Sequence, residues 1–447
     1  MNIAESAAIE QIFIARGWAK AEDPQVADVV IINTCSVRAT AENRIFGRLG
    51  FYAGLKALRA KESNAKTKSL EKALEYVKDQ AKPLTLIVTG CMAERLLNSL
   101  QEEYPFIDYV VGTYAKKNFA QIISAIENGK QFFNDKENLA YAFAPISAEP
   151  GAFSTFVPIM HGCNNFCTYC IVPHVRGREI SRPFNQIIQE LDVLASYGVK
   201  EITLLGQNVN SYHDDKIDFP TLLTLMENHL AKTSSSIKWI RFLSSHPKDL
   251  THDLIKVMAS SQYICHHLHL PVQHGSDKIL QAMNRKYTSS HYLSLIDSIK
   301  SAIPDISLTT DIMLGFPGET EEDFLAALNL MRTVCYENAF MYYFNPREGT
   351  PAFSMGNQIP IEVKKERLQK IIDTQQIITR TQMEKRIGTT TTVLVEAESK
   401  SNKSELLGKT PQDHRVVFKA DAGLIGTFAK VELTKLSGQT FKGTLVS

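Results

Sequence analysis

Six short apolar segments between residues 155 and 344 constrain the fold of this 447-residue chain more than any other feature. Each has the pattern of a buried strand, and helical patterns such as Asn185–Ser196 and Glu321–Val334 fill the intervals. This regular alternation predicts an incomplete TIM-type barrel with its active site at the carboxyl ends of the strands. The predicted strands are Thr155–Met160, Lys200–Leu205, Ile237–Leu243, His267–Pro271, Ile306–Leu314 and Ala339–Phe344.

Three cysteines with the spacing C-x3-C-x2-C directly follow the first of these strands: Cys163, Cys167 and Cys170. Three thiolates on one loop can converge on one metal centre. A 4Fe–4S cluster usually takes four cysteine ligands, so three would leave one iron open to another ligand. The alternative is a structural zinc loop completed by His161 or His174. We favour the cluster, because zinc sites are more often built from paired cysteine or cysteine–histidine sets.

The sequence ahead of this loop predicts an α/β layer up to about residue 140. Its apolar runs have the pattern of buried parallel strands, and amphipathic or Lys- and Glu-rich helical segments separate them. The predicted elements are a helix over Met1–Arg16, strands over Val26–Asn33, Leu84–Thr89 and Tyr109–Gly112, and a solvated helix within Ala57–Gln80.

Two further cysteines, Cys35 and Cys91, stand at the carboxyl ends of the first two predicted strands of this layer. Open α/β sheets bind their ligands at this edge. A single cysteine is more often a small buried apolar residue. Their equivalent positions leave ligation and burial as two open interpretations.

The rest of the chain divides by composition. Ala142–Ala152 is a Pro-, Ala- and Gly-rich linker, Ile361–Arg386 predicts a long polar helix, and short alternating runs from Thr389 predict a small all-β module. The expected domains are therefore residues 1–140, 152–382 and 383–447. The last domain carries more Lys and Arg than acidic residues, which suits RNA or an ordinary surface.

The composition limits the classes of protein to which this chain can belong. The net charge is +1, so a nucleic acid would have to be met by a local patch. Seven cysteines, three of them crowded on one loop, indicate a reducing cytoplasm and metal ligation rather than a disulfide framework. The sequence has no apolar run of membrane-spanning length, and Met1–Glu10 lacks the features of a signal peptide. We expect a soluble, cytoplasmic protein.

Six motifs together resemble the radical S-adenosylmethionine (SAM) methylthiotransferases, over nearly the whole chain. The resemblance implies an N-terminal Rossmann-like domain, an incomplete TIM-type radical SAM barrel and a C-terminal all-β TRAM barrel. The motifs are NTCSVR at Asn33–Arg38, TGCMAER at Thr89–Arg95, GCNNFCTYCIVPHVRGRE at Gly162–Glu179, LLGQNVNSY at Leu204–Tyr212, HLPVQHGSD at His269–Asp277 and GKTPQDHRVVF at Gly408–Phe418.

This resemblance implies that Cys163, Cys167 and Cys170 hold the radical SAM cluster, whose open iron binds the amino and carboxylate groups of SAM. An electron from the cluster would then cleave SAM to a 5′-deoxyadenosyl radical. The candidates for the SAM pocket are Tyr169, beside the last cysteine, and residues at later strand ends. These are Gly206, Gln207, Ser244, Ser245, Gln273 and Gly315. For the loop that begins at Gly315, ordinary turn chemistry is an almost equal alternative.

The family holds a second 4Fe–4S cluster with three N-terminal cysteines, and Cys35 and Cys91 match two of them. The third would fall directly ahead of Met1, together with the first strand of the sheet. We therefore expect a start assigned too late or a truncated chain, and the second cluster depends on that missing ligand. Cys265 and Cys335 match no cluster position and are expected to be buried thiols.

The implied reaction is methylthiolation of C2 of N6-isopentenyladenosine in the tRNA anticodon loop, next to the anticodon. It would use two SAM molecules, a sulfur source and an electron donor such as flavodoxin, and the protein would act as a monomer. The expected RNA contacts are Lys409, His414 and Arg415. Alternative substrates are N6-threonylcarbamoyladenosine in tRNA and a ribosomal protein. An alternative of another class is a zinc-containing RNA-binding protein.

Overall fold

The computed structural model describes residues 1–36, 39–60, 83–97, 99–130, 141–143, 148 and 151–446. The chain forms two compact units. The N-terminal unit comprises Met1–Ser147, Gly162–Asn164 and Cys170–Ile180, and the barrel unit comprises Ala148–His161, Asn165–Tyr169 and Ser181–Ser447. The boundaries of the three expected domains, at 140, 152 and 382, stay a prediction.

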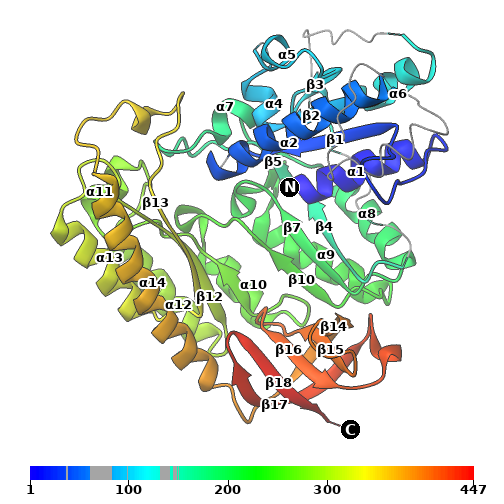
Figure 1. The fold of residues 1–447 in the computed structure, drawn as a ribbon. Helices are drawn as coiled ribbons and strands as arrows, with labels where there is room; N and C mark the ends of the chain where they lie inside the picture. The colour runs from blue at the N-terminus through cyan, green and yellow to red at the C-terminus, as the bar shows by residue number, and fades with distance from the viewer. Residues whose placement is uncertain are drawn as a thin grey trace. The chain divides into compact units, whose positions relative to one another are not determined.

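The N-terminal unit is built on a parallel sheet of three strands in the order β1-β2-β3 (Figure 1). The strands β1 (Val29–Thr34), β2 (Thr85–Gly90) and β3 (Tyr109–Val111) confirm the three predicted ones to within three residues at either end. The helices are α1 (Asn2–Ile14), α2 (Ala39–Arg59), α4 (Cys91–Arg95), α5 (Leu100–Glu103), α6 (Phe119–Glu127) and, from the second part of the cysteine loop, α7 (Val172–Arg176).

Apolar side chains cover both faces of this sheet. On one face, Phe13 of α1 and Phe119 of α6 pack against Ile87 of β2. On the other face, Leu49 and Leu55 of α2 belong to the cluster that buries the side chains of β1 and β2. Burial on both faces explains why these strands read as continuous apolar runs.

Helix α2 was missed by the sequence analysis, which predicted a helix over Ala57–Gln80 instead. Most of that segment, and part of the expected linker Ala142–Ala152, lies outside the described residues. The 21 residues of α2 include Gly47, Gly50 and Gly54, each about 1 kcal/mol less favourable in a helix than alanine. Packing against the sheet outweighs this weak local propensity.

The described part of the barrel unit has the six parallel strands that the sequence predicts (Figure 1). They form two three-stranded sheets of order β10-β7-β4 and β11-β12-β13, and a parallel bridge joins Ile240 to Ile264. The alternation of strands and helices confirms the incomplete barrel. The strands are β4 (Ser154–Pro158), β7 (Glu201–Leu205), β10 (Trp239–Phe242), β11 (His267–His269), β12 (Ser307–Leu314) and β13 (Asn338–Tyr343).

Helices fill the intervals between these strands, and the segment predicted over Glu321–Val334 has the same bounds in the structure. The helices are α8 (Phe184–Ser196), α9 (Phe219–Lys232), α10 (His252–Ser260), α11 (Asp277–Ala282), α12 (Ser289–Ala302), α13 (Glu321–Val334) and α14 (Ile361–Glu384). Four strands of two residues are β5 (Met160–His161), β6 (Ile180–Ser181), β8 (His213–Asp214) and β9 (Ile217–Asp218).

The predicted C-terminal all-β module is a closed barrel of order β14-β15-β16-β18-β17. Its core is so narrow that a Cβ on Gly408 would lie 2.4 Å from Val393 and one on Gly443 would lie 2.3 Å from Val431. The strands are β14 (Thr390–Glu398), β15 (Glu405–Lys409), β16 (Arg415–Lys419), β17 (Phe428–Ser437) and β18 (Thr440–Leu445).

Helix α14 joins this barrel to the strands before it. Its buried residues recur every three or four positions, which places them on one side of the helix: Lys364, Arg367, Ile371, Gln375, Thr379 and Met383. The last of these, Met383, belongs to the core of the C-terminal barrel.

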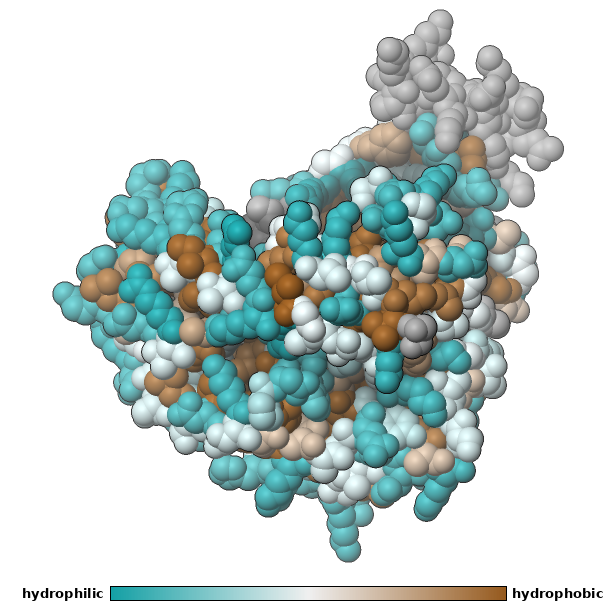
Figure 2. Space-filling view, turned by 90° about the horizontal axis from the view of Figure 1, so that it is seen from below, coloured by the Kyte–Doolittle hydropathy of each residue, from teal (hydrophilic) through white to brown (hydrophobic). Residues whose placement is uncertain are grey.

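Among the residues that the structure describes, no helix is both long enough and apolar enough to span a membrane. Figure 2 shows hydrophilic side chains over much of one face of the molecule, with smaller apolar patches between them.

Candidate functional site

Cys167 is the cysteine of the motif that belongs to the barrel unit, and a buried arginine lies beside it. Nη1 of Arg285 stands 3.5 Å from its sulfur, and Nη2 donates to the carbonyl of Pro271 at 2.8 Å. Nε donates to the hydroxyl of Tyr287 at 2.8 Å. Burial lowers the pKa of Arg285, but Tyr287, Tyr169 and Cys167 raise it well above its ordinary value. The guanidinium therefore remains charged beside the thiol.

Backbone contacts fix the loop around this cysteine. Thr168 donates through N to the carbonyl of Met283 at 3.1 Å, and its own carbonyl accepts from N of Ala352 at 2.9 Å. Nδ2 of Asn284 donates to the carbonyl of Phe166, which has a positive φ of 49°. The predicted pocket residue Tyr169 is half-buried and packs among Met283, Phe316 and Phe344.

Cys163 and Cys170 belong to the N-terminal unit. Cys163 is buried and donates through N to the carbonyl of Gly177 at 3.1 Å. The preceding Gly162 is required, because it has a φ of 77° and a Cβ would lie 2.0 Å from the carbonyl oxygen of Arg178. Cys170 is half-buried.

No three His, Cys, Asp or Glu side chains of the described residues are grouped to hold one metal ion. A single zinc ion needs its sulfur ligands about 2.3 Å from one point. The thiolates of an iron–sulfur cluster instead bind separate irons and stand further apart. The three cysteines are the right donors for a cluster, and their ligation stays a prediction.

The predicted pocket residues at the ends of β7 and β10 lie next to each other. N of Val209 donates to the carbonyl of Ser244 at 3.2 Å, and Asn210 exchanges hydrogen bonds with the backbone of His246 at 2.8 and 2.9 Å. Ser244 has a φ of 67°, an unfavourable conformation for a residue other than glycine. Such strain is concentrated at binding sites. At Gly206, a Cβ would lie 3.0 Å from Met160.

Four side-chain atoms of these two loops are buried without a hydrogen-bond partner in the described protein. They are Oε1 of Gln207, Oδ1 of Asn208, Oγ of Ser245 and Nε2 of His246. Buried polar atoms usually have partners, so a group of orphans marks a place where a polar ligand fits. Asn208 and His246 were missed by the sequence analysis, although each directly follows a residue that it singled out. Burial, with the charges of Arg285 and Lys248, lowers the pKa of His246 to about 2, so the ring is neutral.

The other two predicted pocket residues have contrasting surroundings. Gln273 is buried with a φ of 71°, and its Oε1 accepts from the hydroxyl of Tyr342 at 3.0 Å. N of Gly315 donates to Oε2 of Glu319 at 2.7 Å, and Arg367 is paired with the same carboxylate at 2.6 Å. The loop from Gly315 to Glu319 is thus held by its own protein contacts, which favours the turn interpretation there.

Cys35 and Cys91 lie at the same edge of the N-terminal sheet. Each follows one member of the parallel register pair Thr34–Gly90 at the ends of β1 and β2. Cys91 is buried and packs against Ile171 and Val175. The two thiols therefore stand on neighbouring strand ends, where the sequence placed them.

Arg176 of α7 contacts the sulfur of Cys91. Its Nε donates to Sγ at 3.2 Å, Nη1 is paired with Oε1 of Glu5 at 2.7 Å, and Nη2 donates to Oδ1 of Asn2 at 3.3 Å. Burial lowers the pKa of this guanidinium, but the charges of Glu5 and Cys91 outweigh burial and raise it. The sequence analysis missed this network, because Arg176 and Cys91 are 85 residues apart.

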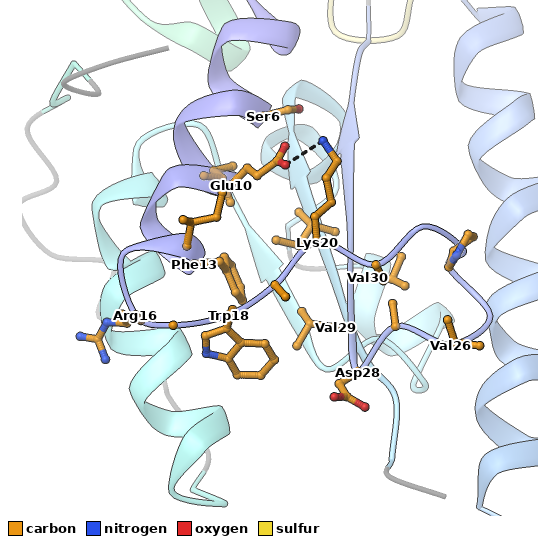
Figure 3. A pocket seen from close by; sticks show the side chains of 18 residues that line it. Ser6, Glu10, Phe13, Arg16, Trp18, Lys20, Val26, Asp28, Val29 and Val30 are labelled. Atoms are coloured by element: carbon orange, nitrogen blue, oxygen red, sulfur yellow. Dashed lines mark ion pairs between the residues drawn. The ribbon is translucent and has the colours of Figure 1, made fainter. Parts of the chain in front are cut away.

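A groove of about 750 Å³ runs beside β1, lined by α1, by the segment after it and by Val29–Ile31 (Figure 3). An ion pair of 2.7 Å between Glu10 and Lys20 lies in it. In the described sheet, β1 pairs with β2 alone. The groove therefore runs along the side of β1 that faces away from β2. It contains no cysteine, and we do not assign the chemistry to it.

Two of the three expected RNA contacts are wrong. Nζ of Lys409 is paired with the buried Glu201 of β7 at 2.7 Å, and the largely buried His414 is paired with Glu337. Both residues hold the C-terminal barrel against the strands of the same unit. Arg415 is exposed, and its contact with RNA stays a prediction.

Comparison with known proteins matches three families in chain order. Residues 1–64 match the uncharacterized protein family UPF0004, residues 157–331 the radical SAM superfamily, and residues 384–446 the TRAM domain. A tRNA-2-methylthio-N(6)-dimethylallyladenosine synthase of Treponema denticola is 48% identical, covering all of this chain and 97% of the relative. The synthase of Carboxydothermus hydrogenoformans is 40% identical, again with 100% and 97% covered.

The chain belongs to this synthase family. Its radical SAM domain implies a 4Fe–4S cluster and SAM as cofactors, which confirms that part of the sequence prediction. The family also confirms the resemblance to the radical SAM methylthiotransferases.

Two solved structures share the fold. A radical SAM methyltransferase of Kitasatospora setae, with cobalamin and a 4Fe–4S cluster bound, has a TM-score of 0.55 at 12% identity and covers 78% of this chain and 73% of its own. A cobalamin-dependent SAM radical enzyme has a TM-score of 0.51 at 12% identity, with 84% and 53% covered.

Proposed function

We propose that this protein adds a methylthio group to C2 of N6-dimethylallyladenosine in tRNA. The observation that carries the proposal is 48% identity to a synthase of that name along the whole chain. Cys35, Cys91, the three cysteines of the loop and the strand-end residues are present, and the orphaned polar atoms of the barrel support a site for a polar cofactor there.

Cys163, Cys167 and Cys170 would hold the radical SAM cluster. When bound, the cluster and SAM would supply the radical chemistry. Arg285 keeps a positive charge beside Cys167. The orphaned oxygens of Gln207, Asn208 and Ser245 offer hydrogen-bond acceptors, and the Ser245 hydroxyl also offers a donor, to the polar groups of SAM.

Cys35 and Cys91 would hold the second cluster with a third ligand. The neighbouring strand ends support this assignment. The start of α1 lies at the same end of the sheet, because Nδ2 of Asn2 donates to the carbonyl of Thr34 at 2.9 Å.

The tRNA would lie on the outer face of β16, β18 and β17 of the C-terminal barrel. Arg415 and Lys419 are exposed on β16, and Lys442 of β18 is the register partner of Lys435 on β17. These four cations replace Lys409 and His414 of the sequence prediction, whose side chains are ion-paired within the unit. Such contacts to phosphates position an RNA without reading its sequence.

Nucleoside analysis of tRNA from a deletion strain tests the function. We expect loss of 2-methylthio-N6-dimethylallyladenosine and accumulation of its unmethylthiolated precursor, both reversed by the unaltered gene. Loss of a threonylcarbamoyl-type methylthio nucleoside, or unchanged tRNA with an unmodified ribosomal protein, would instead assign one of the alternative substrates.

A further inference from the structure

The contact between Arg176 and Cys91 joins two motifs that the sequence separates. Arg176 stands six residues after Cys170, and Cys91 follows β2. Because α7 belongs to the N-terminal unit and packs against Cys91, this part of the cysteine loop lies beside a proposed ligand of the second cluster.

Two hydrogen bonds from adjacent residues hold the end of α7 in this place. Oγ1 of Thr113 donates to the carbonyl of Val175 at 2.8 Å, and the hydroxyl of Tyr114 donates to the carbonyl of Arg176 at 2.6 Å. The guanidinium is 3% exposed. A buried arginine fixed by its backbone and by Glu5 has little freedom to leave the sulfur.

We propose that Arg176 is a positioning residue that sets the reduction potential of the second cluster through its hydrogen bond to Cys91. This inference rests on the proposed second cluster. Hydrogen bonds to cluster sulfurs and net positive charge stabilise the reduced, more negative form, and so raise the potential. Glu5 opposes this effect, because its carboxylate offsets the charge of Arg176.

Removing each of the two buried charges should therefore shift the midpoint potential in opposite directions. This difference separates an electrostatic role from a structural one. Arg176→Met removes the donor and the positive charge, and should shift the midpoint potential to more negative values. Glu5→Gln keeps the donor and removes the negative charge, and should shift it to less negative values. A purely structural network would move both variants in the same direction.

The test uses the full chain with Cys163, Cys167 and Cys170 replaced by alanine, reconstituted anaerobically with iron and sulfide. We expect the iron that remains, about four per chain when a third ligand completes the pair of Cys35 and Cys91, to be in the second cluster. Dithionite titration, followed by electron paramagnetic resonance of the reduced cluster, gives the midpoint potential of this parent and of each variant. Arg95→Met is the matched control, because Arg95 pairs with Glu42 at 3.0 Å without contacting the sulfur, and its potential should stay at the parent value.

Two further variants guard against misfolding. Glu5→Gln/Arg176→Met removes both charges of this ion pair. Arg176→Lys keeps the charge without the planar donor set and should give an intermediate potential. An unchanged potential in Arg176→Met or its double variant, or equal shifts in Arg176→Met and Glu5→Gln, would overturn the role of Arg176. A parent without iron would overturn the second cluster, and the inference with it. The function itself is judged separately, by the tRNA nucleosides of the deletion strain.

Discussion

Two buried arginines, each beside a cysteine sulfur, make the N-terminal unit and the barrel unit directly comparable. Arg176 pairs with the carboxylate of Glu5, so its charge is compensated. Arg285 donates to a carbonyl and a hydroxyl, and among the described residues it forms no ion pair with a carboxylate. An arginine therefore lies beside each sulfur. At Cys91 its charge is largely offset by Glu5, and at Cys167 it remains a net positive charge.

This difference suits the two chemistries that we propose. The surroundings of Cys167 favour extra negative charge on a cluster, as needed by a site that receives an electron for SAM cleavage. The surroundings of Cys91 hold the sulfur in position, and they stabilise negative charge on it less than the surroundings of Cys167 do. The following predictions test the comparison.

Replacing the cysteines should separate the two sites most strongly. Cys167→Ala should abolish both 5′-deoxyadenosine formation and tRNA methylthiolation, with a loss of about four irons per chain. Cys91→Ala should abolish methylthiolation while SAM cleavage continues. Iron and sulfide analysis with chromatography of the products measures both. Cys265→Ala is the control, because burial raises the pKa of that thiol to about 12 and keeps it protonated. Equal loss of SAM cleavage in Cys167→Ala and Cys91→Ala would contradict separate roles for the two sites.

Removing the arginines should have unequal effects on stability. Arg176→Met breaks the buried ion pair with Glu5, which should lower the free energy of unfolding by about 3–5 kcal/mol. Arg285→Met removes hydrogen bonds to neutral acceptors, which should cost about 1–3 kcal/mol. Urea unfolding of the apoprotein measures both values. Adding Glu5→Gln should restore much of the first loss, and no restoration would contradict an uncompensated charge as the cause.

A third buried arginine extends the comparison to pH. Arg241 and Lys409 both pair with Glu201 at 2.7 Å. Burial raises the pKa of this carboxyl, but the two cations outweigh burial and lower it below its ordinary value of 4.5. Its folded-state pKa lies below the unfolded one, so its stabilisation is present above about pH 4.5 and is lost as the pH falls through the folded value.

Glu201→Gln should therefore be less stable than the unaltered chain at pH 7, by about 1–3 kcal/mol. Its stability should also fall less steeply below pH 4.5. Thermal unfolding from pH 3 to pH 7 measures the difference. Parallel curves for both proteins would show that this carboxylate does not contribute to the acid dependence.

Neutralising the exposed cations should have the smallest effect. Arg415→Gln and Lys442→Gln should each weaken tRNA binding a few-fold and lower the slope of log affinity against log salt by about 1. Fluorescence anisotropy at several salt concentrations measures this. Lys403→Gln is the control, because Lys403 is exposed on the β14–β15 loop and not on the proposed face. Equal effects of all three changes would argue for a diffuse charge effect.

The sequence predicted the parts of the molecule whose causes are local. The barrel strands and α13 have strong periodic patterns, and the strand-end position of Cys91 follows from the apolar run before it. Helix α2 was missed because its glycines weaken the local signal, and its stability comes from packing. Arg285 and Lys409 were missed or misread because their partners, Cys167 and Glu201, lie 118 and 208 residues away. A positive charge in a sequence looks the same whether it meets RNA or a buried carboxylate.

Helix α14 is a spacer of fixed length. Its one-sided burial begins at Lys364 under the barrel loops and ends at Met383 inside the C-terminal barrel. One inserted residue would advance the far end by about 1.5 Å and rotate it by about 100°. Met383 and Lys409 could then no longer both reach their partners. The number of residues in this helix, more than their identity, therefore sets the direction in which the basic face of the C-terminal barrel points.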